Sequence, residues 1–307
     1  MKTILEKKSY GKINLYLEVH NRLESGFHNI STLFSEIGLY DILKFSVTKN
    51  GDLKLLSTIE NLANQENLIY KVAIFIQNRY SVRCGALIEL EKNIPIAAGL
   101  GGGSSNAATT IKGLSELWSL ELKREEMHEI AAHFGSDINF FLDGFQAIGK
   151  NRGEIIEPLG EEVFFDNILL LNPGFEISSR EAYDKLQITN HKSQITPTST
   201  LKSQSEIGTR KSGVAEQFPI PYPLEKLLET KNPEYCFNRL EEGICQKYPI
   251  IRETLELLEK HGAIKAILSG SGPTMIGFFD NPQTMKKTQK FFLEKKFWSY
   301  MTTTRRR

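Results

Sequence analysis

A glycine-rich segment in the first half of the chain constrains the possible folds more than any other feature. It runs through Pro95, Ile96, Ala97, Ala98, Gly99, Leu100, Gly101, Gly102, Gly103, Ser104 and Ser105. Glycine lets the backbone reach positive φ angles and lets a ligand approach the main chain closely. Residues 84–91, just before this glycine loop, predict a strand. The segment on the other side of the loop therefore decides what the loop can bind.

A helix is predicted directly after the glycine loop, because apolar residues recur at helical spacing at Ala107, Ala108, Ile111, Leu114 and Trp118. Ser104 and Ser105 stand where the N-cap of this helix is expected. Free N–H groups and the positive end of a helix dipole converge at such a point, so the loop predicts a phosphate site. A flexible Gly/Ser linker is the alternative, but linkers do not lie between a strand and an amphipathic helix. No lysine follows the last glycine, as it would in a Walker A motif, so the neutralising charge must come from elsewhere in the chain.

The composition is ordinary for a globular protein, with 40% hydrophobic and 24% charged residues among 307. A net charge of +1 gives no bulk field for nucleic acid or an anionic membrane, so we expect neither as a partner. Three widely spaced cysteines without a C-x-x-C pattern predict free thiols in a reducing compartment. No apolar run approaches a membrane span and the N-terminus has no apolar leader, so we expect a cytoplasmic protein. The terminal arginines 305–307 predict a solvated tail.

Hydrophobic patterning places strands and helices along the whole chain, and their mixed order favours an α+β fold. Strands are expected at 12–19, 35–47, 52–57, 168–171, 264–268, 274–279 and 297–301. Further helices are expected at 67–80, around 127–134, and at 223–230, 234–247, 249–261 and from 282. The polar stretch 189–217 predicts a mobile loop or insertion, with plain disorder as the alternative.

The strand expected at 12–19 alternates strictly between apolar and polar residues. Such a strand buries one face, with successive side chains on opposite sides. Lys12 and Asn14 must then point the same way, which matters if either carries chemistry.

Three segments stand out together: Gly11-Lys12-Ile13-Asn14-Leu15, the glycine loop, and the third glycine motif Ser269-Gly270-Ser271-Gly272-Pro273. In this order they resemble the motifs of the GHMP kinases, the small-molecule kinases that include galactokinase, homoserine kinase, mevalonate kinase and phosphomevalonate kinase. The resemblance spans nearly the whole chain. It implies a two-domain α+β small-molecule kinase fold with the active site in the inter-domain cleft. Residues 1–160 would form the N-terminal ATP-binding domain, and 161–307 a C-terminal α+β domain carrying the insertion at 189–217.

Within that family, the chain most resembles the branch whose acceptor is 4-diphosphocytidyl-2-C-methyl-D-erythritol. The stretches that carry this likeness are 11–15, Gly26-Phe27-His28 with Thr32, Phe34, Leu39 and Asp41, 99–108, and Gly135-Ser136-Asp137 before Phe140-Phe141. The branch implies ATP-dependent phosphorylation of the 2-hydroxyl of that substrate, in the non-mevalonate route to isoprenoid precursors. A homoserine or mevalonate kinase is one alternative, which the Gly26-Phe27-His28 element disfavours. A non-catalytic sensor of ATP and ligand is another, which the presence of both Lys12 and Asp137 disfavours.

Phosphoryl transfer to an alcohol requires charge neutralisation and a proton acceptor. By resemblance, Lys12 and Asp137 form the catalytic pair. Asp137 would accept the hydroxyl proton, and Lys12 would stabilise both Asp137 and the migrating charge. Two structural alternatives stay open: an N-cap role for Asp137 and a solvated edge-strand lysine for Lys12.

The resemblance also implies an acceptor site at Asn14, Ser179 and Tyr183. Phe27 and Tyr183 could stack on the two faces of the cytosine, and His28 could read its edge. An ordinary core role for both rings, and no role for His28, are the alternatives. Phe27 stands where the family commonly has Tyr, and Asn139 where it has Pro.

ATP is the implied co-substrate, and Mg²⁺ is expected with it. No acidic residue is clearly placed to hold the metal, so Ser104 or Ser105 could ligate it, or phosphates and water could hold most of it. The expected partner is the small-molecule acceptor, and the expected assembly is a monomer or weak homodimer.

Overall fold

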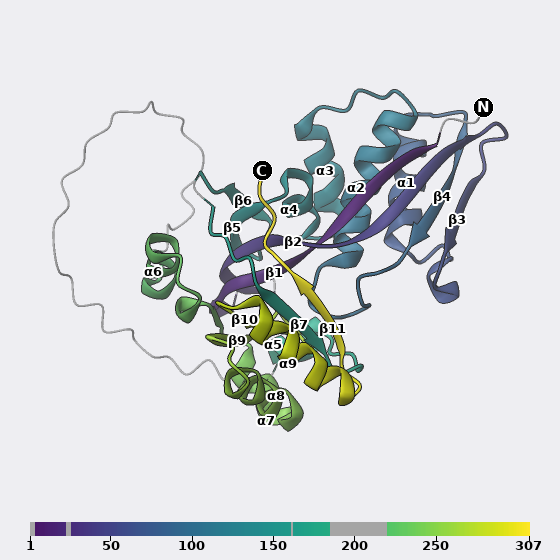
Figure 1. The fold of residues 1–307 in the computed structure, drawn as a ribbon. Coiled ribbons are helices and arrows are strands. Elements are labelled where there is room, and N and C mark those ends of the chain that lie inside the picture. Colours follow the sequence, from purple (N-terminus) through teal and green to yellow (C-terminus); the bar gives the residue numbers. More distant parts are fainter. Residues whose placement is uncertain (1–3, 23–25, 161, 185–219) are drawn as a thin grey trace, which may run out of the picture.

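The computed structural model describes residues 4–22, 26–160, 162–184 and 220–307, which form a mixed α+β fold (Figure 1). The expected α+β class is confirmed. The insertion expected at 189–217 lies outside the described residues. The strands are β1 (Leu5–Arg22), β2 (His28–Thr48), β3 (Leu53–Ser57), β4 (Gly85–Glu91), β5 (Gln146–Asn151), β6 (Ile155–Pro158), β7 (Ile168–Asn172), β8 (Phe237–Asn238), β9 (Lys265–Leu268), β10 (Met275–Phe278) and β11 (Trp298–Thr302). The helices are α1 (Leu68–Arg79), α2 (Gly102–Leu117), α3 (Arg124–Phe134), α4 (Ile138–Asp143), α5 (Ser179–Asp184), α6 (Tyr222–Thr230), α7 (Glu241–Lys247), α8 (Pro249–Lys260) and α9 (Pro282–Glu294), with 3-10 turns η1 (Glu60–Leu62) and η2 (Pro233–Tyr235).

The first sheet is built around the long antiparallel pair β1 and β2. On its other edge β2 pairs with β5 over residues 30–35 and with β4 over residues 42–48. Among the described strands, none pairs with this edge over residues 36–41. The C-terminal segment reaches part of this gap, where Ile37 forms a bridge with Thr304 and the Gly38 N–H donates to the Thr303 carbonyl at 3.2 Å.

The second sheet is antiparallel, in the order β11-β7-β10-β9, and packs against the first. Helices α1, α2 and α3 cover one face of the first sheet, and α7, α8 and α9 lie at the opposite end of the molecule beside the second sheet (Figure 1). Between the two sheets, Ile13 and Leu15 of β1 share a buried cluster with Ile168 and Leu170 of β7.

The prediction that β1 buries only one face is wrong. Its central residues are buried on both faces, because the helices cover one side of the first sheet and the second sheet covers the other. Lys12 and Asn14 are 5% and 3% exposed although both are polar. Alternation of apolar and polar residues indicates which side chains share a face of the strand. It does not indicate that the polar face is exposed, because a strand in a layered fold can be covered on both faces.

Most of the other expected elements are present, with one clear error. The helix expected at 234–247 is η2, the short strand β8 and then α7. Asn238 explains the interruption, because its side chain donates to the carbonyls of Leu268 and Gly270 at 2.7 Å and accepts from the Leu240 N–H. These bonds hold the chain in the sheet where the apolar spacing alone predicts a helix. Strands β5 and β6 and helices α4 and α5 have no counterpart among the expected elements.

The terminal arginines are docked, so the prediction of a solvated tail is wrong for Arg305. Its guanidinium lies 3.4 Å from the ring centroid of Tyr10 and 2.5 Å from a carboxylate oxygen of the buried Glu36. Arg306 and Arg307 pair with Asp166 and Glu162 at 3.0 and 3.1 Å. The C-terminus is thereby tied to the first sheet.

All three thiols are free, as the sequence predicts. Cys236 and Cys245 are buried, and Cys84 is partly exposed. Among the described residues, no helix combines the length and apolar character that crossing a bilayer requires.

Candidate active site

A cavity of about 1050 Å³ opens among β1, β2, the glycine loop, α5 and the third glycine motif. Most residues that the sequence singles out line it: residues 95–104, with Lys12, Asn14, Phe27, His28, Asp137, Ser179, Tyr183, Gly270 and Ser271. Ser105, Ser269 and Gly272 do not. We call residues 95–104 with Leu62, Asn67, Leu68 and Lys92 the loop half, and Phe27, His28, Arg152, Ser179 and Tyr183 the aromatic half.

The glycine loop needs backbone conformations that few residues adopt. Its φ angles are +74° at Gly99 and +67° at Gly101, and the non-glycine Ala97 also lies at +49°. Helix α2 begins at Gly102, with Gly101 at the N-cap and no side-chain cap. The N-cap expected at Ser104 and Ser105 is therefore wrong, because both serines lie inside the first helical turns. The free N–H groups of the helix start with the glycines themselves.

Neighbouring segments hold the glycine loop tightly. The Lys12 N–H donates to the Leu100 carbonyl at 2.9 Å, and the Ser269 hydroxyl donates to the Gly99 carbonyl at 3.2 Å. A Cβ at Gly101 would lie 2.8 Å from Phe141 Cζ and 3.0 Å from Lys12 Cγ. The loop thus leaves room for no side chain at this point.

Lys12 lies where the two halves of the cavity meet. Its ammonium donates to Asn14 Oδ1 at 2.7 Å and lies 3.8 Å from Asp137 Oδ2. Asn14 in turn donates to the Thr32 hydroxyl at 2.8 Å. The bond between Lys12 and Asn14 confirms the expectation that these two side chains share a face. Burial lowers the pKa of the Lys12 ammonium below its ordinary value, while the charge and hydrogen bond of Asp137 oppose that shift.

The structural alternatives for these two residues do not fit their surroundings. Lys12 is buried in a strand with neighbours on both edges, so it is not a solvated edge lysine. Asp137 does occupy the N-cap position of α4, but its side chain makes no capping bond. Its carboxylate is instead 37% exposed and faces Lys12.

The aromatic half gathers side chains from three distant segments. The rings of His28 and Tyr183 are stacked, with centroids 5.5 Å apart and planes at 18°. Phe27 is 56% exposed, and the Arg152 guanidinium lies 5.0 Å from its ring centroid. Burial, together with the nearby negative charge of Asp137, raises the pKa of the Tyr183 hydroxyl, so this group stays neutral.

The third glycine motif joins the two halves. The hydroxyls of Ser271 and Ser179 lie 3.2 Å apart, and a Cβ at Gly270 would lie 3.0 Å from Asn14 Oδ1 and 3.5 Å from Lys12 Nζ. Gly270 has φ +55°, which favours glycine. Ser269 does not line the cavity itself, but its hydroxyl holds the glycine loop through the hydrogen bond to Gly99.

Comparison with known proteins agrees with this geometry. Residues 67–144 match the GHMP kinases N terminal domain, and residues 224–297 match the GHMP kinases C terminal domain. A 4-diphosphocytidyl-2-C-methyl-D-erythritol kinase from Thermoanaerobacter pseudethanolicus is 37% identical, across 92% of this chain and 90% of its own. The chain belongs to this kinase family. The expected resemblance, to the GHMP kinases and to this branch of them, is confirmed.

Solved structures give the same relationship. A crystal structure of 4-(cytidine 5'-diphospho)-2C-methyl-D-erythritol kinase superimposes with a TM-score of 0.77 at 26% identity, covering 97% of this chain and 98% of that one. Mevalonate kinase from Methanococcus jannaschii superimposes with a TM-score of 0.69 at 14% identity, covering 100% and 99%. The second likeness concerns the fold alone. Together they confirm the expected kinase fold.

Sequence reasoning missed the cationic side chains of this family member's cavity. Arg22, Arg152, Arg180 and Lys92 all line it. Arg152 follows β5, a strand without a clear hydrophobic pattern. Arg22 and Arg180 lie near segments that the sequence singles out, but no pattern marks these two arginines themselves. The glycine loop itself contains no cation, and this lack is the signal that cationic side chains from other segments must neutralise the phosphates.

Proposed function

We propose that this chain transfers the γ-phosphoryl group of ATP to the 2-hydroxyl of 4-diphosphocytidyl-2-C-methyl-D-erythritol, as an ATP-dependent small-molecule kinase of isoprenoid precursor synthesis. The observation that carries the proposal is the Lys12–Asp137 pair, with 3.8 Å between charged atoms, at the junction of the two cavity halves. The alternatives of a homoserine kinase, a mevalonate kinase or a sensor are not favoured by the relatives.

The loop half would bind the phosphates of ATP. The first main-chain N–H groups of α2 would donate hydrogen bonds to phosphate oxygens in the cavity. The positive end of the helix dipole lies at the same place and favours the negative charge of the phosphates. The absence of a side chain at Gly101 lets the phosphates approach the backbone. The γ-phosphate would then lie near the buried Lys12 ammonium, whose positive charge stabilises the charge that moves during transfer.

Asp137 would accept the proton from the attacking hydroxyl. A general base must reach the proton that it removes, and the partly exposed Asp137 carboxylate faces the cavity beside Lys12. The Lys12 ammonium lies 3.8 Å from this carboxylate, and Asn14 orients the ammonium through its 2.7 Å bond. The hydroxyl oxygen then attacks the γ-phosphorus while ADP leaves.

The aromatic half would bind the cytidine diphosphate part of the acceptor. Phe27 and Tyr183 offer ring faces for the base, His28 a polar edge, and Ser179 a hydroxyl. The guanidinium groups of Arg22, Arg152 and Arg180 supply donors suited to a diphosphate.

Mg²⁺ is the expected companion of ATP, and it supplies charge neutralisation on the phosphates when bound. Among the described residues, no three His, Cys, Asp or Glu side chains form a metal cluster. The oxygen donors of Asp137 and Ser104 both line the cavity. This donor set fits a metal held mainly by ATP phosphates and water.

The domain boundary, the assembly, the location and the class of partner are proposed here as well. We propose a boundary between the two domains near residue 160, a monomer or weak homodimer as the assembly, a cytoplasmic location, and a small molecule rather than nucleic acid or membrane as the partner.

The test is ADP release by the purified chain with the cytidyl acceptor, beside homoserine and mevalonate. We expect turnover with the cytidyl acceptor only, and loss of turnover in Lys12→Met. Equal turnover with homoserine or mevalonate would exclude the assigned acceptor. No ADP release with any acceptor would overturn the kinase assignment.

A further inference from the structure

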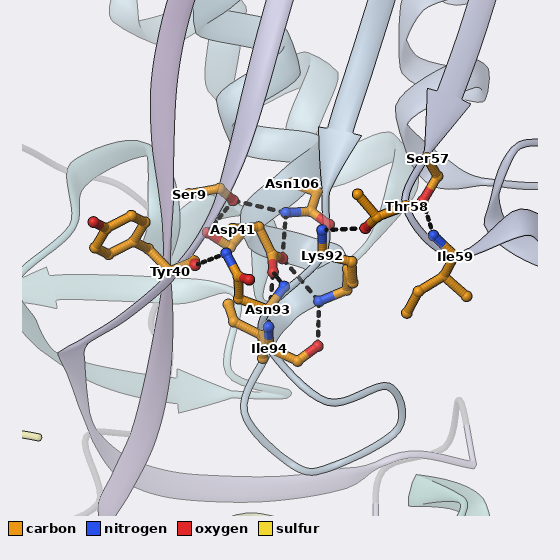
Figure 2. Close-up of polar contacts among 11 residues, drawn as sticks. Ser9, Tyr40, Asp41, Ser57, Thr58, Ile59, Lys92, Asn93, Ile94 and Asn106 are labelled. Atoms are coloured by element: carbon orange, nitrogen blue, oxygen red, sulfur yellow. Dashed lines mark hydrogen bonds and ion pairs between the residues drawn. The ribbon is translucent and has the colours of Figure 1, made fainter. Parts of the chain in front are cut away.

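A buried polar cluster, which includes the cavity-lining side chains Lys92 and Asn106, lies beneath the glycine loop. It centres on Asp41, which is 0% exposed and lies in β2 just before that strand pairs with β4. Figure 2 shows Lys92, Asn93, Ile94 and Asn106 converging on its carboxylate. No part of the proposed phosphoryl transfer uses this carboxylate, so its role needs a separate explanation.

Within the described part of the chain, the hydrogen bonds to the Asp41 carboxylate come from one end of the glycine loop or the other. Oδ1 accepts from the N–H groups of Asn93 and Ile94 at 2.7 and 2.8 Å, directly before the loop begins at residue 95. Oδ2 accepts from the Lys92 ammonium at 2.8 Å and from the Asn106 side-chain amide at 2.9 Å. Asn106 lies inside α2, directly after the loop.

Further contacts join the cluster to the residues that flank the glycine loop and to the start of α2. The Lys92 ammonium donates to the Ile94 carbonyl at 2.5 Å, and a Cβ at Gly102 would lie 3.1 Å from the same nitrogen. The Asn106 amide donates to the Ser9 hydroxyl at 2.9 Å, and Ser9 shares a 2.8 Å hydrogen bond with Ser105. The first residues of α2 therefore rest directly on Lys92 and Ser9.

A bare carboxylate in this place would oppose phosphate binding. Burying a charge is costly unless it is paired, and a negative charge beneath an anion site repels the anion. Lys92 removes both problems, because the pair carries no net charge. Asp41 supports the positive charge of Lys92, which burial alone disfavours.

We propose that Asp41 and Lys92 form a positioning pair that clamps the two ends of the glycine loop and presents its N–H groups to the nucleotide phosphates. This inference rests on the proposed function, in that the phosphates of ATP bind this loop. The pair acts through the loop and does not touch the reacting atoms. Asn106 extends the clamp from the loop entrance to the helix.

The chain offers a matched control on the same strand. Glu36 is also a buried carboxylate of β2, at 5% exposure, and its partner is Arg305. It does not line the cavity, and within the described residues its hydrogen bonds and ion pair involve no residue of the glycine loop. A role limited to stabilising β2 would make Asp41 and Glu36 behave alike.

The test is ADP affinity by calorimetry, with the unfolding temperature measured on the same samples. We expect Lys92→Met to weaken ADP binding by at least about tenfold, because it leaves Asp41 uncompensated beneath the phosphates. Asp41→Asn should weaken it less, and the double variant Asp41→Asn/Lys92→Met should bind better than Lys92→Met alone. Glu36→Gln should lower the unfolding temperature but leave ADP affinity within about twofold of the parent.

The outcomes separate this inference from the proposed function. An unmodified chain that binds no ADP would overturn the proposed function itself. Normal ADP binding by Lys92→Met, or a double variant weaker than both single variants, would overturn the clamp. If Lys92→Met does not fold, Asn106→Ala removes one donor to Asp41 and keeps the ion pair. Hydrogen exchange should then rise at the amides of residues 96–104, and unchanged exchange there would overturn the clamp.

Discussion

The two halves of the cavity differ in whether backbone or side chains form their surface. The loop half is mainly backbone from one continuous segment, held by bonds to Lys12, Ser269 and the Asp41 cluster. The aromatic half consists of side chains from Phe27 and the start of β2, the turn after β5, and α5. Phe27, its most exposed ring, is 56% accessible, whereas Leu100 in the glycine loop is 1% accessible.

This difference follows from the two ligands that the halves would bind. A phosphate chain is recognised by N–H groups and charge, which a short glycine-rich segment at a helix start supplies. A base is recognised by flat apolar surfaces and a few polar groups, which must come from several places in the fold. The first half can therefore be fixed before binding, and the second depends on side chains meeting across the cavity.

The largest expected effect lies at the junction of the halves. Asp137→Asn should lower kcat by ~10²–10⁴, the range typical of a lost general base, with ATP affinity little changed. Steady-state kinetics and nucleotide calorimetry separate the two quantities. Asp143→Asn is the matched control, because Asp143 ends the same helix and pairs with Arg124. Turnover that stays near normal in Asp137→Asn would leave this residue a structural role only.

The next effect tests whether the loop half is backbone recognition. Gly101→Val should weaken ATP binding by about 100-fold or more, because the new side chain meets Phe141 and Lys12 and φ is +67°. The control is Gly113→Ala within α2, where a Cβ would lie 2.6 Å from the Phe45 ring. This control should lower stability without changing ATP affinity. Equal ATP affinity in folded Gly101→Val would count against the loop as the ATP site.

A smaller effect tests the aromatic half. Phe27→Ala and Tyr183→Ala should each raise the acceptor KM by ~10-fold, since a stacked base is worth about 1–3 kcal/mol. The ATP KM should hardly move. Tyr222→Ala serves as the control, because Tyr222 is an exposed ring, at 63% accessibility, that does not line the cavity. A rise in the ATP KM instead would show that the aromatic half binds ATP, which would contradict the division of the cavity into two ligand sites.

The smallest effect at neutral pH concerns Lys12. Burial lowers its pKa, so as pH rises the ammonium loses its proton earlier than an ordinary lysine would. Activity should therefore fall on the alkaline side at a pH below 10.5, the ordinary lysine value. Lys12→Arg keeps its charge throughout and should lose this alkaline limb, at a lower kcat. An identical alkaline limb in Lys12→Arg would assign the titration to another group.

The same contrast explains what the sequence could predict. The loop half was predictable because its signal is local: a strand, four glycines and a helix succeed one another directly. Lys12 was predictable because its strand alternates and lies in a motif. The N-cap at Ser104 was predicted wrongly because glycine at positive φ can begin a helix without a side-chain cap.

The remaining parts depend on contacts that local patterns do not encode. Arg152 enters the cavity only because β5 pairs with β2, and β5 has no clear period. The interruption of the helix expected at 234–247 depends on Asn238 bonding to residues about 30 positions later. Arg305 is docked because Glu36 is buried in a strand far away in sequence. Long-range pairing decides each of these features.

The central claim is that one cavity joins ATP to an acceptor recognised through its cytidine. The most direct measurement compares kcat/KM of the unmodified chain for the complete cytidyl acceptor and for methylerythritol phosphate, which lacks the cytidine, at saturating ATP. We predict a value about 100-fold or more lower for the shortened acceptor, the equivalent of losing roughly 2.7 kcal/mol of transition-state binding. Equal kcat/KM for the two acceptors would contradict the account, because nothing in the aromatic half would then be reading the base.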